Sequence, residues 1–194
     1  AAALAAEAEA NGVEIRTHAA AIGFYPEDEG GVLAVDDAGS LLRLSAERFV
    51  YATGGYDTNA LFGDNDRPGI CAARAVGTLL VRYGVIPGKR PIVLGRGEYA
   101  GALAAALDRA GCDVISVEEV DEQATRALGQ TWVSGLEMKP REGGKARKVA
   151  CDLIAVAATP APASELARMH GAAVEFRAEG GGFAVVTDGH GRSS

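Results

Sequence analysis

The stretch Ile92-Val93-Leu94-Gly95-Arg96-Gly97-Glu98-Tyr99-Ala100-Gly101 decides the fold that this sequence predicts. A short apolar run ends at Gly95, a glycine turn follows, and residues 102–107 have the composition of a helix. Gly111 is expected to end that helix, and residues 114–118 are expected to form a second strand that ends in an acid, Glu118. This order is typical of a dinucleotide-binding strand–helix–strand unit, with GxGxxA at the turn and an acidic residue about twenty positions further on.

Each position in the turn has a physical role in that interpretation. Gly95 allows the tight turn, and Gly97 lets a pyrophosphate approach the backbone because it has no Cβ. Ala100 is small enough for the helix to pack on the strand, and the helix N-terminus offers free N–H groups to phosphates. Glu118 is placed to accept hydrogen bonds from the adenosine ribose. The expected NAD-binding residues of this unit are Gly95, Arg96, Gly97, Glu98, Ala100 and Glu118.

The alternative is a plain strand–helix–strand unit whose glycines serve only a tight turn, since the chain contains 26 glycines. Two further strand ends favour the nucleotide. Small residues at a strand's carboxyl end let a ligand lie against the backbone. The strand predicted before Ala52-Thr53-Gly54 ends in this way, and so does the almost wholly apolar strand before Ala158-Thr159. Taken alone, Ala52-Thr53-Gly54 is better explained as a strand meeting a turn, but its position before the dinucleotide unit reverses that preference.

Composition narrows the class of protein. The 194 residues suffice for one large domain or two small ones, and 48% are hydrophobic. A net charge of −7 with no basic cluster argues against nucleic acid, and no apolar run has membrane-spanning length. The first ten residues lack the features of a signal peptide. The three cysteines form no C-x-x-C, so neither a zinc site nor a thioredoxin-like pair is expected, and a reducing cytoplasmic setting is the default.

The remaining elements are predicted from local patterns. Helices are expected at residues 1–10, 71–83 and 165–170, the last capped by Ser164; strands are expected at 13–15, 19–24, 32–35, 41–44, 48–51, 132–138, 148–151, 152–158, 174–176 and 183–186. Residues 121–128 are expected to be helical or loop-like, and 58–68 a linker. The acidic turn at 27–31 and the basic turn at 140–148 are interpreted as solvated, rather than as metal and phosphate sites. The three histidines are scattered, so the catalytic residues stay unknown and no metal is expected.

The order of these motifs resembles a known family. The motifs follow one another in a fixed order. First come an Ala-Thr-Gly strand, the linker 67–70, a helix and the segment 87–90. The glycine fingerprint, the Ala158-Thr159-Pro160 strand end and a closing Asp188-Gly189 segment come after them. This is similar to the FAD-dependent pyridine nucleotide-disulphide oxidoreductases, which have two dinucleotide-binding domains. Within them, the linker and Pro87-Gly88-Lys89-Arg90 resemble the alpha subunits of heterotetrameric sarcosine oxidase and their opine- or glycine-oxidising relatives.

The resemblance implies an α/β fold: a Rossmann-like dinucleotide-binding domain with a small β-meander from a FAD-binding domain. Residues 1–62 would be part of the FAD-binding domain, 63–187 the NAD(H)-binding domain and 188–194 the start of a return to the FAD domain. Ala52-Thr53-Gly54 would form one wall of the FAD site. Since a FAD-binding glycine turn is missing from the sequence, this polypeptide alone is not expected to hold FAD stoichiometrically.

The function implied is that of a flavin-dependent oxidoreductase fragment, inactive alone. NAD would be one cofactor and FAD the other in the full-length protein, with a small amine, amino acid or opine as substrate. Other subunits of a hetero-oligomer are the expected partners, and neither nucleic acid nor a membrane is. The missing C-x-x-C argues against disulfide reduction. The alternative is a non-catalytic nucleotide-binding or subunit-assembly module; a stand-alone NAD-dependent reductase is a weaker third hypothesis.

Overall fold

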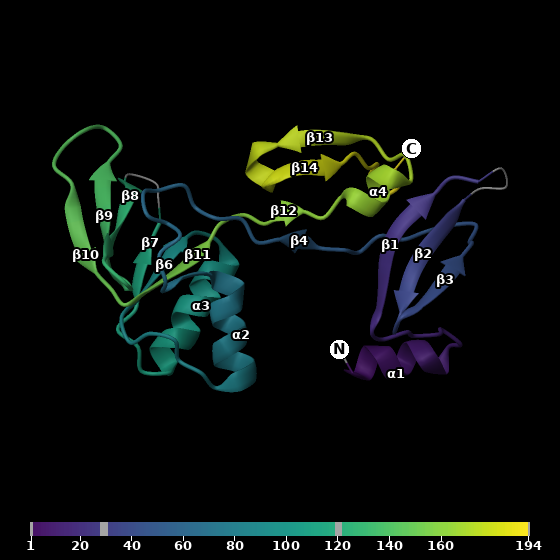
Figure 1. The fold of residues 1–194 in the computed structure, drawn as a ribbon, viewed down its shortest axis with the longest axis horizontal. Coiled ribbons are helices and arrows are strands. Elements are labelled where there is room, and N and C mark those ends of the chain that lie inside the picture. Colours follow the sequence, from purple (N-terminus) through teal and green to yellow (C-terminus); the bar gives the residue numbers. More distant parts are fainter. Residues whose placement is uncertain (1, 28–30, 119–121, 194) are drawn as a thin grey trace. The chain divides into compact units, whose positions relative to one another are not determined.

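The computed structural model describes residues 2–27, 31–118 and 122–193. The chain divides into two compact units, whose elements are labelled in Figure 1. The first unit is Ala1–Gly54, Pro162–Ala178 and Gly182–Ser194. The second unit is Gly55–Ala161 with Glu179–Gly181.

The first unit is built mainly from short antiparallel strands. Helix α1 (Ala2–Ala10) ends at Asn11-Gly12, where Gly12 has a φ of 82° that suits glycine. Strands β1 (Ala19–Tyr25), β2 (Val32–Asp37) and β3 (Ser40–Leu44) then form an antiparallel sheet in that order. Later come helix α4 (Glu165–Met169) and the antiparallel pair β13 (Val174–Arg177) and β14 (Gly182–Val185). A 3₁₀ turn, Ala178–Gly180, follows β13 in the sequence, and its last two residues belong to the second unit.

An aromatic cluster holds α4 against β1. The His170 ring stacks on Phe24 with centroids 3.8 Å apart, and Phe49 meets both rings edge-on. The Tyr51 hydroxyl lies 3.0 Å from His170 Nδ1, within hydrogen-bonding distance. Phe24 is the buried centre of this cluster, with 4% of its surface exposed.

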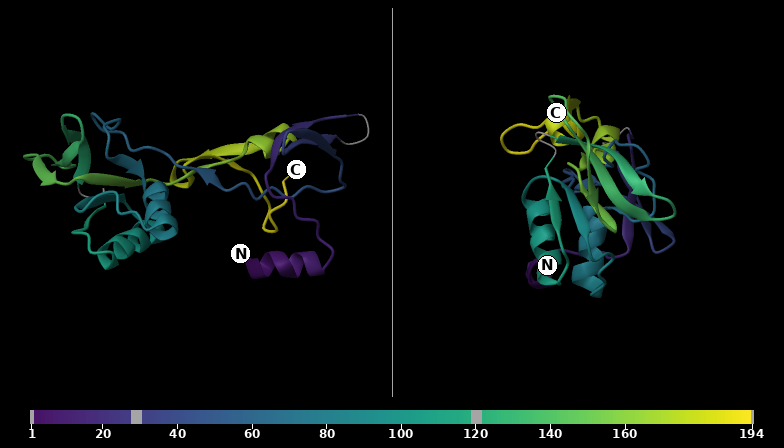
Figure 2. Two further views of the ribbon diagram at one scale, coloured as in Figure 1. Left: turned by 60° about the horizontal axis from the view of Figure 1, so that its bottom comes forward. Right: turned by 90° about the vertical axis from the view of Figure 1, so that its left-hand side faces the viewer.

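The second unit has a parallel sheet at its centre. The sheet contains β5 (Ile70–Ala72), β11 (Leu153–Ala157), β6 (Pro91–Gly95) and β7 (Ile115–Val117), in the order β5-β11-β6-β7. Helix α2 (Ala73–Tyr83) connects β5 to β6, and helix α3 (Glu98–Arg109) connects β6 to β7. The two helices contact each other and lie side by side in Figures 1 and 2. The short strands β4 (Gly55–Tyr56) and β12 (Ala161–Pro162) pair with each other.

Two hydrophobic cores lie on opposite faces of this sheet. Alternate residues of β6 and β11 belong to different cores, because successive side chains of a strand point to opposite faces. Val93 and Ala155 pack with α2 and α3, whereas Leu94 and Ile154 pack with the antiparallel meander. That meander contains β8 (Glu122–Gly129), β9 (Val133–Pro140) and β10 (Arg147–Ala150). The predicted Rossmann-like α/β fold, with a central apolar strand at β11, is confirmed.

Two predicted strands and one predicted helix cap were wrong. Residues 13–15 form no strand; they are irregular, and Val13 N–H donates to the Ala8 carbonyl at the end of α1. The stretch before Ala52-Thr53-Gly54 is also irregular, since no strand lies beside it among the described residues and Val50 is 92% exposed. Ser164 precedes α4, but its side chain makes no capping hydrogen bond.

The prediction of a helix or loop at 121–128 was wrong for an instructive reason. Residues 122–128 belong to β8, and the register shifts between Ala124 and Arg126. Such a bulge interrupts the alternation of a strand. Ala124 and Ala127 therefore both become buried, three positions apart, which is a helix-like spacing. Residue 121, and residues 28–30 of the predicted acidic turn, lie outside the described residues.

Helix α2 starts two residues later than predicted, because Ile70–Ala72 form the edge strand β5. Val76 is fully buried on the expected face, and Gly84 ends the helix in the left-handed conformation, with a φ of 65°. Tyr83, placed on the same face by the sequence, is 62% exposed. The expected linker 58–68 is irregular but attached, since Gly63 exchanges hydrogen bonds with Thr125 and Ala127 of β8.

Candidate functional site

The two glycines of the fingerprint turn have different surroundings. A Cβ built on Gly95 would lie 2.3 Å from the Ala157 carbonyl oxygen, because β6 and β11 pair in register there. A Cβ built on Gly97 would meet no atom within 4 Å. Both residues have positive φ, 135° and 95°. Gly95 is therefore required by the packing of the sheet, whereas the space above Gly97 is open to a ligand.

Helix α3 begins at this open space. Gly97 is its N-cap residue and supplies no side-chain acceptor, so the first N–H groups of the helix are left for an external anion. Ala100 is only 6% exposed and packs in the core between α3 and the sheet. A larger residue at position 100 would push the helix away from the strand. This geometry fits a pyrophosphate at the N-terminus of α3.

A small hollow joins the turn to the end of β7. It has a volume of about 80 Å³ and is lined by Val93, Gly95, Arg96, Gly97, Ala100, Gly101, Ser116 and Glu118. The structure thus brings together five of the six residues predicted from this unit. Glu98 is exposed and does not line the hollow.

Ser116 is a lining residue that the sequence prediction missed. It pairs in register with Val93 of β6 and stands two residues before Glu118, hence on the same face of β7. The alternation of side chains along β7 was the signal that could have identified it. Glu118 itself is exposed at the rim of the hollow.

The end of β11 reaches the same edge of the sheet. Ala157 pairs with Gly95, so Ala158 and Thr159 follow β11 directly beside the glycine turn. The Thr159 carbonyl accepts a 2.9 Å hydrogen bond from the Thr58 hydroxyl. Ligands of open α/β sheets bind outside the carboxyl ends of the strands, and this is where both residues lie.

Ala52, Thr53 and Gly54 belong to the first unit. The Thr53 hydroxyl donates to the Ala163 carbonyl over 2.7 Å, and the Ala163 N–H donates to the Gly54 carbonyl over 3.0 Å. Gly54 has a φ of 69°. The segment is therefore fixed by hydrogen bonds within its own unit, and its proposed role as a wall of a FAD site stays a prediction.

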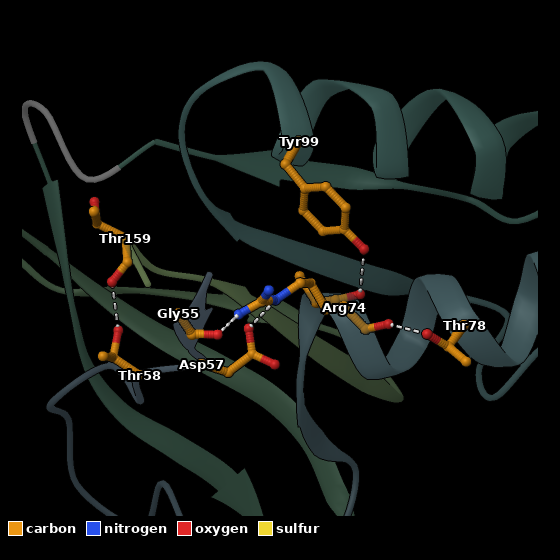
Figure 3. A network of polar contacts seen from close by, with 8 residues as sticks. Gly55, Asp57, Thr58, Arg74, Thr78, Tyr99 and Thr159 are labelled. Carbon is orange, nitrogen blue, oxygen red and sulfur yellow. Dashed lines mark hydrogen bonds and ion pairs between the residues drawn. The ribbon is translucent and has the colours of Figure 1, made fainter. Parts of the chain in front are cut away.

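A polar network at the start of α2 was not predicted from the sequence (Figure 3). Arg74 donates from Nε to Asp57 over 2.6 Å and from Nη2 to the Gly55 carbonyl over 2.9 Å. Tyr99, in the first turn of α3, donates to the Ala73 carbonyl over 3.4 Å. Burial raises the pKa of Tyr99, an effect that Arg74 opposes and Asp57 reinforces, so these charges lie close enough to act on its hydroxyl.

The three cysteines are free. Burial raises the pKa of the Cys112 thiol and, more strongly, that of the Cys151 thiol, to about 11. Nearby Asp152 adds to both shifts. Because the thiolate is the reactive form, these two side chains are poor nucleophiles at neutral pH. Both side chains are buried, with 7% and 6% of their surface exposed, respectively.

Two other features of the described residues are plain. No helix there is both long and apolar enough to cross a membrane. No group of three or more histidine, cysteine or acidic side chains is arranged to hold a metal ion within the same described ranges.

Comparison with known proteins places the chain in a class. No family model matches it. It is 31% identical over 159 residues to sarcosine oxidase subunit alpha of Rhizobium meliloti (strain 1021), a match that covers 74% of this chain and 16% of that protein. The chain thus spans about one sixth of the length of the curated relative that it matches.

Several solved structures share the fold of this chain. The L-proline dehydrogenase of P. horikoshii superposes with a TM-score of 0.71 at 23% identity, over 91% of this chain and 34% of that chain. Thioredoxin reductase of T. acidophilum superposes with a TM-score of 0.71 at 16% identity, over 100% of this chain and 67% of that chain. A FAD-dependent pyridine nucleotide-disulphide oxidoreductase of Desulfovibrio vulgaris superposes with a TM-score of 0.62 at 17% identity, over 90% of this chain and 50% of that chain.

The predicted resemblance to the FAD-dependent pyridine nucleotide-disulphide oxidoreductases is thus confirmed: the chain shares its fold with these solved structures and part of its sequence with the curated relative. More narrowly, the chain is a homologue of a segment of sarcosine oxidase subunit alpha.

Proposed function

We propose that the second unit is the NAD(H)-binding portion of a flavin-dependent oxidoreductase that acts on an amine, amino acid or opine. In the intact protein, hydride would pass between the nicotinamide and a flavin. The observation that carries this proposal is the open space above Gly97 at the N-terminus of α3, with Glu118 lining the same hollow. The names of the relatives, sarcosine oxidase and L-proline dehydrogenase, support the substrate class.

The residues of the second unit fit NAD. Gly97 and the first turn of α3 would hold the pyrophosphate, since the N–H groups there have no side-chain cap. Glu118 would accept hydrogen bonds from the adenosine ribose and would repel the 2′-phosphate of NADP. Ser116 would line the same side. The nicotinamide supplies the hydride chemistry when bound, while the protein supplies position and electrostatics.

The residues of this chain do not by themselves fit FAD. Ala52-Thr53-Gly54 offers one backbone segment, and no long helix of the first unit begins at a glycine turn among the described residues. The flavin is therefore assigned to the intact protein. The buried thiols likewise provide no support for disulfide chemistry.

The alternative is a module that binds the nucleotide without turnover, or that serves subunit assembly. The word "subunit" in the name of the curated relative supports partners of that kind. The two functions differ in what NADH does to the flavin. We expect NADH to bleach the flavin absorbance of the intact flavoprotein under anaerobic conditions. Gly97→Val should abolish this bleaching by blocking the pyrophosphate, without removing the flavin.

Bleaching that survives Gly97→Val would mean that the nicotinamide reaches the flavin through another site. Nucleotide binding without bleaching would favour the non-catalytic module. The matched control is Gly84→Val, because Gly84 also has a positive φ, 65°, and a Cβ built there also meets no atom within 4 Å, but it ends α2 and does not line the hollow.

A further inference from the structure

We propose that Arg74 recognises the nicotinamide-side phosphate of the dinucleotide, as a specificity-determining residue that sequence motifs did not identify. This inference rests on the proposed function. It extends the site from the glycine turn to the other half of the ligand.

The sheet order determines where the second half of the dinucleotide must lie. Glu118 follows β7 and would bind the adenosine ribose, and the pyrophosphate would lie at the turn after β6. In the order β5-β11-β6-β7, the nicotinamide half then extends in the opposite direction, over the carboxyl ends of β11 and β5. Thr159 follows the first of these strands, and α2 starts directly after the second.

Arg74 lies at that place. It is the second residue of α2, and the preceding carbonyl, that of Ala73, accepts the hydrogen bond from Tyr99 in the first turn of α3. This bond ties the starts of the two helices together, as Figure 3 shows. Gly77 makes room for the contact, because a Cβ there would lie 2.6 Å from the Tyr99 hydroxyl. Arg74 is thereby held beside the helix that would carry the pyrophosphate.

The Arg74 guanidinium has more N–H donors than its described contacts use. Asp57 engages Nε and the Gly55 carbonyl engages Nη2, while Nη1 has no partner among the residues that the structure describes. The side chain is 42% exposed. These two contacts therefore fix the orientation of the planar guanidinium group, and its Nη1 edge is available to a ligand. Arginine forks match phosphate oxygens, and such charge-assisted bonds are the strong ones.

The position of this charge also conflicts with local helix stability. A cation in the first turn of a helix is unfavourable because the helix N-terminus is already positive, and α2 has no acidic residue in its first turn. Asp57 offsets the conflict from outside the helix. Residues that break a local rule in this way are concentrated at functional sites.

The test compares two ligands that share the adenosine half. NADH carries the nicotinamide-side phosphate and AMP does not. Binding of each to the 194-residue chain is measured by calorimetry or, for AMP, by NMR titration. Arg74→Ala should weaken NADH about tenfold or more, the usual effect of losing a hydrogen bond to a charged group. Its effect on AMP should stay within about twofold. Arg74→Lys keeps the positive charge without the planar guanidinium group, so its NADH affinity should lie between those of the unmutated chain and Arg74→Ala.

The matched control is Arg126→Ala. Arg126 also donates from Nε to an aspartate, Asp64, over 2.6 Å, but it lies on β8 of the meander. Arg126→Ala should leave the affinities for NADH and AMP unchanged. If the alanine variant at position 74 does not fold, the lysine variant must show the same split between NADH and AMP.

Equal weakening of both ligands by the variants at 74, or an unchanged NADH affinity, would overturn the assignment of Arg74 while leaving the proposed function intact. If the unmutated chain bound neither ligand, the proposed function would fail, and this inference with it.

Discussion

The two units bury apolar surface very differently. The buried residues of the first unit are few, chiefly Phe24, Ala34 and Val35 of the sheet and Ala167 of α4. The second unit contains two separate cores, one on each face of its parallel sheet. Apolar side chains of the first unit such as Val50 (92%) and Phe176 (63%) are largely exposed. Because hydrophobic burial is the dominant stabilising term, the second unit should be the more stable of the two and should hold its site rigidly.

The largest expected effect tests that contrast directly. Ile154 is fully buried in the central strand β11, so Ile154→Ala should lower the free energy of unfolding of the second unit by about 2–5 kcal/mol. Val50→Ala in the first unit should change stability by less than about 0.5 kcal/mol, because the side chain is already in water. Urea unfolding followed by circular dichroism measures both. Similar losses for the two variants would refute the contrast.

Next in size is a contrast between the two glycines. Gly95→Ala forces a Cβ against the Ala157 carbonyl oxygen, a backbone atom that cannot move aside cheaply, so it should destabilise the second unit. Gly97→Ala meets open space but takes a backbone conformation (φ 95°, ψ 178°) that residues other than glycine rarely adopt, so it should cost about 1–3 kcal/mol. It should nevertheless weaken NADH binding at least tenfold, since the new methyl group would occupy the proposed position of the pyrophosphate.

Thermal unfolding and NADH titration of both variants separate the two roles. If Gly97→Ala bound NADH normally, the open space above it would have no role in binding. If Gly95→Ala were as stable as the parent chain, the close approach of β6 and β11 would be less restrictive than the structure indicates.

The smallest effect is a dependence of stability on pH from the Cys151 thiol. Its pKa is raised from the ordinary value of 9.0 to about 11, first because burial disfavours the thiolate. A raised pKa means that the folded state holds the proton more tightly than the unfolded chain. The stabilisation is thus fully present below pH 9 and is lost as the pH rises through about 11.

Unfolding free energies measured from about pH 8 to a pH just above the raised pKa of about 11 should therefore fall across this window. The fall should be smaller in Cys151→Ala, which has no thiol to ionise. An identical fall in Cys151→Ala would assign the effect to other groups.

Local patterns in the sequence were sufficient for most of the second unit. The run before Gly95, the helix-ending Gly111 and the apolar run ending at Ala157 each determine an element through backbone or burial preferences that do not depend on distant residues. The hollow at the turn was predictable for the same reason, since its residues come from one strand–helix–strand unit.

Features that depend on distant contacts were missed. The bulge in β8 interrupts the two-residue alternation of buried and exposed side chains that identifies a strand, and β5 is too short for such an alternation to be recognised. Residues 49–51 have the composition of a strand, but pairing needs a neighbouring strand, which composition cannot supply. Arg74 meets Asp57 and Gly55 across 17 and 19 residues, respectively, through contacts that only the folded chain reveals.

The most direct test of the central claim is calorimetric titration of the unmutated 194-residue chain with NADH and, separately, with NADPH. NADH should bind, and NADPH should bind more weakly, because Glu118 at the end of β7 would accept the ribose hydroxyls and would repel a 2′-phosphate. Glu118→Arg should reduce or reverse that preference. Equal or tighter binding of NADPH by the unmutated chain would contradict the role given to Glu118, and binding of neither nucleotide would contradict the claim that the second unit is an NAD(H) site.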